Sequence, residues 1–562
     1  MIIKTLQPFR SSIITSKIIQ LKKEISENKL SWIALASICA LVAFFDFFST
    51  VPLNDDWAYS WSVQNFVSGH NFQLMPTLSA WALPQIGIGI LATLPHYDLH
   101  VLRLTVIPFI ALTAIGTFLS SRLLGASKKW SYIAAIVSIS SPVFLSVSVG
   151  YMSDIYFLGF IAISLSFAIR WLKFNQGFKY FWIFGLLSLA QRQMGFLLFI
   201  ALLIGVIAQE RKFLNKKFFL CVTAIFSGVL VSFLISYFLA SESANTRITS
   251  FFIPGGPLLF RGLLAILTWI GFTALPFFLV LWRKKIFTAS TNKTFTLFIF
   301  IFSTVLFFLG ASHILQGGSL IGGEELNTGG LGPLQLEGNK PLLFPLFLFQ
   351  FLELLSLLCV FIYVLKYKTL LWIQKNDGSV VTIVSFSVLL FLLLSNTGFL
   401  DRYVLVILII LIPLFAKAAG KINISRGIAF SIMIPLLLNI FIFIIGEQDY
   451  LSWQTARDQA ARQAYLLFPP SQVSAGQESN ALYYAIPYLE KYHIIPPEYL
   501  DYRQYRANYG PELPKLCIEF GKIDSKLPGV TYNSLAPGKI VLIPSDGKIH
   551  YDQFRKAATG CH

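Results

Sequence analysis

Charged side chains are scarce in this sequence. Only 13% of its 562 residues are Asp, Glu, Lys or Arg, whereas soluble proteins carry about 25%. Hydrophobic residues make up 55%, and the mean hydropathy is +0.68. The composition excludes an ordinary soluble domain and predicts a polytopic membrane protein.

Acidic residues are the scarcer of the two charge types, with 27 carboxylates against 44 Lys and Arg and a net charge of +17. Such an excess of positive charge can indicate nucleic-acid binding. Here the basic residues form short clusters between apolar runs, which is the positive-inside pattern of membrane proteins. We therefore exclude a nucleic-acid partner and expect these clusters in the cytoplasm.

Several common functional motifs are missing. The Gly-rich segment 313–341 lacks the Walker spacing, and no Gly-rich strand-to-helix turn predicts a nucleotide site. No His, Cys and Asp cluster has metal-ligand spacing, so we expect no essential metal and no cofactor. The basic start of the chain is not followed by a cleavable signal, so the first span is expected to be an uncleaved anchor.

The five cysteines divide into two groups. Cys39, Cys221 and Cys359 lie inside apolar runs, where a thiol behaves as a small hydrophobic group. Cys517 and Cys561 lie in the polar tail. If that tail lies outside the cytoplasm, they can form a disulfide. Spacing alone does not decide between a disulfide and two thiols.

Long apolar runs dominate the chain. A membrane span needs roughly 20 apolar residues, and the runs predict about thirteen transmembrane helices. We expect them near 31–51, 101–123, 130–150, 154–170, 178–192, 195–209, 216–240, 259–282, 294–312, 342–366, 380–398, 402–418 and 427–446.

The basic clusters support this count. All of them fall on the cytoplasmic side if the thirteen spans alternate. Residues 78–95 must then stay out of the count, because Pro84, Gly87 and Gly89 interrupt them. An interfacial or re-entrant segment is expected there.

The expected organisation has three parts. Residues 1–30 form a cytoplasmic basic arm, and 31–446 form the transmembrane region. Within that region, 52–100 and the Gly-rich 313–341 are long extracytoplasmic loops. Residues 447–562 are expected to form a small α/β extracytoplasmic domain, which suits a bacterial inner-membrane protein with an outside C-terminus.

Two acidic sites lie next to helices on the same expected face. Asp55 and Asp56 follow the first span, and Asp154 opens the fourth. Ionisable groups near a bilayer are costly and are functional-site hypotheses by default. Both sites also have a structural explanation, because Asn, Ser and Asp favour helix N-caps.

The order of motifs resembles the polyprenyl-phosphate-sugar-dependent glycosyltransferases of the GT-C fold. The similarity is to the protein O-mannosyltransferase and aminoarabinose (lipid A) transferase group. It covers most of residues 30–210 and thins to patches beyond. The motifs are the acidic pair followed by Tyr59, Leu102-Arg103-Leu104, Ser121-Arg122-Leu123-Leu124-Gly125, Ser141-Pro142, Asp154, Leu400-Asp401-Arg402-Tyr403-Val404, Trp453 with Arg457, and Gly476-Gln477-Glu478-Ser479-Asn480.

This resemblance implies an integral-membrane glycosyltransferase. A sugar would pass from a polyprenyl-phosphate donor to a lipid, glycan or protein acceptor on the outer face of the membrane. It implies that Asp55 is the general base, that Asp56 and Asp154 share the catalytic site, and that Tyr59 contacts sugar or acceptor. It implies phosphate binding by three arginines, namely Arg192, Arg402 and Arg103.

Alternative roles exist for several of these residues. The alternative for Arg103 and Arg402 is that their aliphatic stems lie along apolar surface and their charged ends extend to the membrane interface. Arg402 can also pair with Asp401. Trp57 fits an interfacial aromatic belt better than a sugar platform.

The chain departs from the family pattern at three places. The family often has Asp-Glu where this chain has Asp55-Asp56, and Lys where Arg192 stands. It often has His-Pro-Pro where this chain has Leu83-Pro84-Gln85. The last change bears on the acceptor rather than on the donor chemistry.

Two other function classes stay open. A transporter or flippase usually has internal repeats and charges in broken helices at mid-membrane, and neither is evident here. A surface-polysaccharide polymerase or ligase would need Arg and His in a large outer loop. Arg247 and His313 leave that possibility open.

Overall fold

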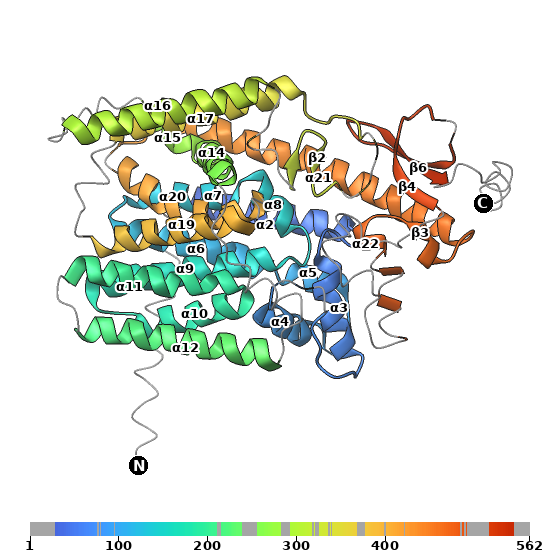
Figure 1. Cartoon of the computed structure of the whole chain (residues 1–562), viewed down its shortest axis with the longest axis horizontal. Coiled ribbons are helices and arrows are strands. Elements are labelled where there is room, and N and C mark those ends of the chain that lie inside the picture. The colour runs from blue at the N-terminus through green and yellow to red at the C-terminus, as the bar shows by residue number, and fades with distance from the viewer. Residues whose placement is uncertain are drawn as a thin grey trace, which may run out of the picture.

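The computed structural model describes residues 29–238, 256–282, 293–367, 377–397, 401–491 and 516–544, with short gaps inside the first, third, fifth and sixth of these ranges. Its long helices lie side by side in one bundle (Figure 1). The helices of the first half are α2 (Lys29–Phe48), α6 (Ile107–Leu124), α7 (Lys128–Ile139), α8 (Pro142–Ser148), α9 (Ser153–Phe174), α10 (Phe178–Gln191), α11 (Phe196–Glu210) and α12 (Lys216–Phe238). Those of the second half are α14 (Gly256–Thr273), α15 (Leu275–Trp282), α16 (Lys293–Leu315), α17 (Leu346–Tyr367), α19 (Gly378–Thr397), α20 (Asp401–Ala419) and α21 (Arg426–Tyr465).

The expected all-helical, polytopic architecture is confirmed, but the count of thirteen spans is not. A helix or a bent pair of helices lies at each expected place. By length and composition, eight helices among the described residues can cross a membrane, or ten if each bent pair is one span. The bent pairs are α7 with α8, at 62°, and α14 with α15, at 74°. The 14 residues of α10 are too few for a full span.

The expected interfacial segment is also a helix. In α4 (Leu83–Thr93), 11 residues form a helix too short to cross a bilayer. It packs between α3 (Asp56–Val67), α5 (Leu99–Leu104) and α10. Figure 1 shows α3, α4 and the sheet of the tail at the same end of the bundle, which we call the α3 end.

The α9 helix lies at the centre of the bundle. In its most apolar window 89% of the residues are buried, against 22% for the peripheral α2 and α12. It packs closely on α6, where Gly116 meets the backbone of Ala162. Because α9 begins with Ser153 and Asp154, this packing fixes a polar pair at the α3 end.

The tail is continuous with the bundle. The expected boundary at 446/447 falls inside α21, whose 40 residues run on to Tyr465. The helix packs against a four-stranded sheet of order β3-β4-β6-β5, with Trp453 and Phe520 rings 5.2 Å apart. The tail elements are η3 (Pro470–Gln472), β3 (Val473–Ser474), α22 (Gln477–Asn480), β4 (Leu516–Gly521), β5 (Gly529–Tyr532) and β6 (Gly538–Pro544).

Sheet pairing in the tail is mixed. The short β3 pairs with β4 in parallel, whereas β4 with β6 and β5 with β6 are antiparallel. The described part of the tail contains both helix and strand. Its independence as a domain stays a prediction, and so does the Cys517–Cys561 disulfide, because Cys561 lies outside the described residues.

The α6–α9 contact gives a stability test. A Cβ placed at Gly116 would lie 2.5 Å from the carbonyl carbon of Ala162. We therefore expect Gly116→Ala to force the helices apart and lower the free energy of unfolding by about 1–3 kcal/mol. The matched control is Gly87→Ala in α4, where nothing lies within 4 Å. Thermal unfolding in detergent is the measurement, and equal midpoints for both variants would contradict this packing.

Candidate active site

Two adjacent acids at the start of α3 have different environments. Asp56 is fully buried, whereas the Asp55 side chain is 30% exposed. Successive residues at a helix start point about 100° apart, so the two carboxylates reach different partners. The acid that solvent and substrate can reach is therefore Asp55.

Asp56 belongs to a buried ion pair with Arg103 of α5. The guanidinium donates to Asp56 Oδ2 at 2.7 and 3.0 Å, and to the carbonyl oxygens of Ser49 and Val51 at 2.8 Å each. Burial raises the pKa of Asp56, and the charge of Arg103 opposes that rise. These bonds pin α5 to the end of α2 and the start of α3.

This geometry gives both residues a structural role. Arg103 is fully buried, and its guanidinium donates to protein acceptors. Phosphate binding by Arg103 and a catalytic role for Asp56 stay predictions.

Asp55 lies against Arg402, at the start of α20. The distance from Arg402 Nη1 to Asp55 Oδ2 is 3.2 Å, and Glu325 Oε1 lies 3.8 Å from the same nitrogen. Asp55 occupies the N-cap position of α3, but within the described residues its side chain makes no capping hydrogen bond. The N-cap explanation therefore does not account for this acid.

Arg192, between α10 and η2 (Gln193–Gly195), forms the third ion pair of this region. Its Nη2 donates to Asp154 Oδ2 at 2.7 Å and to Ser153 Oγ at 2.6 Å. Asp154 lies in the first turn of α9. Asp154 therefore fixes the position of the Arg192 guanidinium.

Tyr59 joins the same group from α3. Its hydroxyl lies 2.8 Å from Ser153 Oγ, and burial raises its pKa to about 12, which keeps it protonated. Only 3% of Tyr59 is exposed, and its expected contact with sugar or acceptor stays a prediction. Trp57, expected in an interfacial belt, is equally buried.

Tyr403 brings the two arginines together. The guanidinium carbon of Arg192 lies 5.3 Å from the centre of its ring, and that of Arg402 lies 5.6 Å away. Contacts of this kind are favourable cation–π interactions. We call Asp55, Arg402, Glu325, Arg192, Asp154 and Tyr403 together the two-arginine site.

A glutamine network supports this site from α4. Gln191 Nε2 donates to Gln85 Oε1 at 2.9 Å and to the carbonyl oxygen of Ser153 at 3.2 Å. The side-chain amide of Gln85 donates to the backbone carbonyl oxygen of Tyr151, and the Tyr151 hydroxyl donates to the backbone carbonyl oxygen of Gln85. Gln85, which stands in the stretch that departs from the family's His-Pro-Pro, thus holds the turn before α9.

The Gly-rich loop reaches the two-arginine site as well. It contains a hairpin of β1 (Leu326–Asn327) and β2 (Gly330–Leu331). The carboxylate of Asp401 accepts from the backbone N–H groups of Glu325 and Leu326 at 2.8–3.1 Å. Asp401 thus anchors the loop instead of pairing only with Arg402. Lys340, further along the loop, forms a buried ion pair with Asp449 of α21.

Sequence reasoning missed several contributors. Glu325, Ser153 and Asn54 were not singled out, and Tyr403 and Glu478 were noted only as parts of motifs. The scarcity of acids was the one available signal for Glu325, which stands in an otherwise Gly-rich loop. Arg247 lies outside the described residues, and His313 lies in the last turn of α16.

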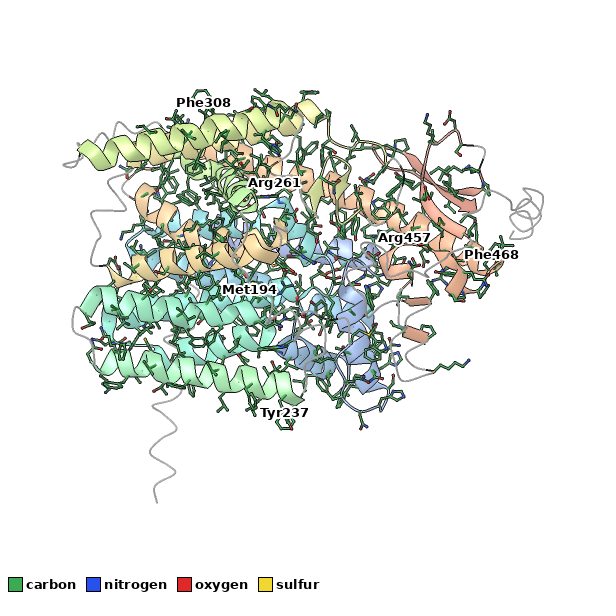
Figure 2. The ribbon with its side chains drawn as sticks, in the orientation of Figure 1. Met194, Tyr237, Arg261, Phe308, Arg457 and Phe468 are labelled. Carbon is green, nitrogen blue, oxygen red and sulfur yellow. The ribbon has the colours of Figure 1, made fainter. Side chains whose placement is uncertain are left out.

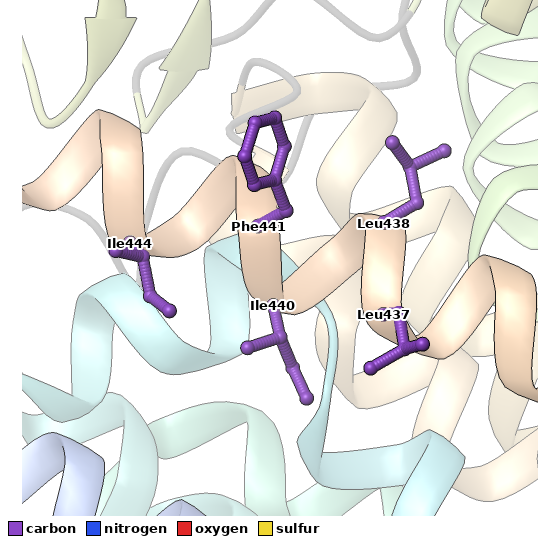
Figure 3. Close-up of a pocket in the computed structure, with 5 residues that line it drawn as sticks. All are labelled: Leu437, Leu438, Ile440, Phe441 and Ile444. Carbon is purple, nitrogen blue, oxygen red and sulfur yellow. The ribbon is translucent and has the colours of Figure 1, made fainter.

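No metal site is evident in the described part of the chain, where no three His, Cys, Asp or Glu side chains converge. An open apolar hollow of about 470 Å³ lies on α21, lined by Leu437, Leu438, Ile440, Phe441 and Ile444 (Figure 3). Further along the same helix lies Arg457, near the tail (Figure 2). One helix therefore carries both an apolar surface and polar residues at the α3 end.

Comparison with known proteins gives matches among solved structures only. No family model and no curated protein matches the chain. ArnT from Cupriavidus metallidurans bound to undecaprenyl phosphate is 11% identical, with a TM-score of 0.45, over 90% of this chain and 97% of ArnT. Its apo state is 9% identical, with a TM-score of 0.44 over 91% and 98%.

A third solved structure is more distant. Arabinosyltransferase EmbB from Mycobacterium smegmatis is 9% identical, with a TM-score of 0.33, over 74% of this chain and 40% of EmbB. At these identities and TM-scores the neighbours assign no activity, so function must be argued from this chain's own residues.

The chemistry available to the two-arginine site follows from its charges. A partly exposed carboxylate can accept a proton, and two guanidiniums can hold an anion. Both guanidiniums lie within 6 Å of the centre of the Tyr403 ring. The arrangement suits a reaction that deprotonates one group while an anionic group leaves.

Replacing Asp55 and Asp56 by asparagine, one at a time, distinguishes the roles of the two acids. Asp56→Asn leaves Arg103 as a buried charge without its counter-ion, so we expect it to cost about 3–5 kcal/mol of stability. Asp55→Asn should fold like the wild type, because the carboxylate it replaces is partly exposed. Heating in detergent followed by size-exclusion chromatography measures both. A stable Asp56→Asn variant would contradict the role of the buried pair.

Proposed function

We propose that this protein is an integral-membrane glycosyltransferase that takes a sugar from a polyprenyl-phosphate donor. The observation that carries the proposal is the two-arginine site. In it a partly exposed carboxylate, Asp55, lies beside the Arg402 guanidinium, and Arg402 and Arg192 both contact the Tyr403 ring. The sugar would go to a lipid, glycan or protein acceptor on the extracytoplasmic face, which is the α3 end in this proposal. The N-terminus would then be cytoplasmic, and the membrane a bacterial inner membrane.

In the proposed reaction Asp55 accepts the proton of an acceptor hydroxyl or amine. The acceptor atom attacks the anomeric carbon, the bond from that carbon to the phosphate oxygen breaks, and the configuration inverts. The departing lipid phosphate carries negative charge, which Arg192 and Arg402 stabilise. Asp154 and Ser153 hold Arg192 in place for this role.

The membrane setting supports a lipid-linked donor. A hydrocarbon chain suits apolar helix surfaces such as the hollow on α21, while a phosphate suits the arginines at the end of the bundle. Nucleotide sugars are cytoplasmic, so an outward-facing enzyme needs a donor that the membrane delivers. The proposal needs no metal and no cofactor.

Asp55→Asn is the decisive variant for the base. Removal of a general base typically costs 10²–10⁴-fold in rate, so we expect kcat to fall by about that factor while donor binding persists. The assay incubates the purified protein in lipid with a set of polyprenyl-phosphate sugars and follows release of polyprenyl phosphate.

The matched control is Asp98→Asn. Asp98 is an exposed carboxylate that caps α5, and Asn keeps the capping ability. Equal release by the wild type and Asp55→Asn would exclude Asp55 as the base. No release with any donor would favour a transporter or flippase, or a polysaccharide polymerase or ligase acting on a larger lipid-linked substrate.

Arg402→Lys tests the phosphate contact. Lys keeps the charge but loses the planar, two-pronged donor geometry that suits phosphate. Loss of a hydrogen bond to a charged group costs about 1.5–3 kcal/mol, so the KM for the lipid donor should rise roughly 10–100-fold. Arg462→Lys is the control, because that arginine is exposed on α21. An unchanged KM would remove Arg402 from the phosphate site.

A further inference from the structure

Asn54, the residue before Asp55, has an unusual backbone conformation. Its φ is +51°, in the left-handed region, and only 6% of the residue is exposed. Asn is among the few residues other than Gly that adopt this conformation readily. The turn it makes sets the direction in which the chain enters α3, and therefore where the Asp55 side chain points.

Two glutamates from distant segments hold Asn54. Glu478 Oε1 accepts its backbone N–H at 3.1 Å, and Glu325 Oε1 accepts its side-chain amide at 2.5 Å. Both glutamates are nearly fully buried. Buried carboxylates make strong hydrogen bonds with such donors.

Each glutamate is itself fixed. Arg457 Nη1 donates to Glu478 Oε2 at 2.6 Å, which links the tail segment to α21. The backbone N–H of Glu325 donates to Asp401, the neighbour of Arg402. The same network thus borders both members of the Asp55–Arg402 pair.

We propose that Asn54 is a positioning residue that sets the distance between the Asp55 carboxylate and the Arg402 guanidinium. Glu325 and Glu478 are the two acceptors that hold it. Its importance for the reaction rests on the proposed function, whereas its effect on the Asp55–Arg402 geometry does not. One consequence is that the Gly-rich loop and the tail segment must both be docked before Asp55 is correctly placed.

A donor–acceptor exchange tests this proposal. Asn54→Asp places a carboxylate against that of Glu325, so the two repel. Misplacement of a catalytic group by about 1 Å costs roughly 100-fold in rate, and we expect kcat to fall by about that factor with little change in the donor KM. Adding Glu325→Gln restores a hydrogen bond with donor and acceptor exchanged, and should return kcat to within about tenfold of the wild type.

Two further variants complete the series. Asn54→Gly keeps the left-handed backbone but removes the amide, so it should also lower kcat if the hydrogen bond to Glu325 matters. The control is Asn65→Asp, the same substitution later in α3, where the amide bonds to the carbonyl oxygen of Asn71 at 3.2 Å. The proposal is overturned if Asn54→Gly has wild-type kcat, or if the double variant is no faster than a folded Asn54→Asp.

A readout that needs no activity separates this proposal from the proposed function. In an Asp55→Cys variant, Arg402 should lower the pKa of the introduced thiol and speed its labelling by a thiol reagent. Adding Asn54→Gly should slow labelling at neutral pH about tenfold, which corresponds to one unit of thiol pKa. Subtraction of the wild-type signal removes the native cysteines.

Failure of the proposed function and failure of the positioning role then give different experimental results. A wild-type protein that releases no polyprenyl phosphate, together with slowed labelling, refutes the enzyme but supports the positioning role of Asn54. Unchanged labelling refutes the positioning role even if the enzyme is active.

Discussion

The free-energy cost of removing a charge from water determines how charged side chains are paired at the α3 end of the bundle. An isolated buried charge costs several kcal/mol, and a chain with so few acids places them where cations need them. Asp56 meets Arg103, Asp154 meets Arg192, Glu478 meets Arg457 and Asp449 meets Lys340. In these pairs both side chains are almost entirely out of solvent. Asp55 differs from these four acids, because its side chain is partly exposed.

Ion pairs and hydrogen bonds at this end also join segments that are far apart in the sequence. Asp55 and Arg402 are 347 residues apart, and Asn54 and Glu478 are 424 apart. Each pair closes a large loop of the chain, so the site exists only once the helices have packed. The central helix α9 supplies Ser153 and Asp154 from the most buried part of the bundle, and these residues then organise Arg192 and Tyr59.

Much of this organisation was predictable from the sequence. Apolar runs located the helices, and the order of motifs brought Asp55, Asp154, Arg192 and Arg402 into one hypothesis. Hydropathy could not reveal which runs bend or fall short of a span, because α7 with α8 and the short α10 also lie in apolar runs of the sequence. The role of Arg103 was also hidden, because its acceptors are backbone carbonyls and Asp56. Glu325 lies in a loop without periodicity, so its approach to Asn54 depends on tertiary packing alone.

The continuity of α21 has a mechanical consequence. At 1.5 Å per residue, 40 residues make a rod of roughly 60 Å, about twice the thickness of the hydrocarbon core of a bilayer. One half carries the apolar hollow and the other half carries Asp449, Trp453 and Arg457 beneath the sheet. The helix is continuous although it contains Pro435, so a tilt imposed on the tail by a docking molecule would be passed along it to the lipid-facing half. Binding of a molecule to the tail would then be coupled to movement of the helix within the membrane.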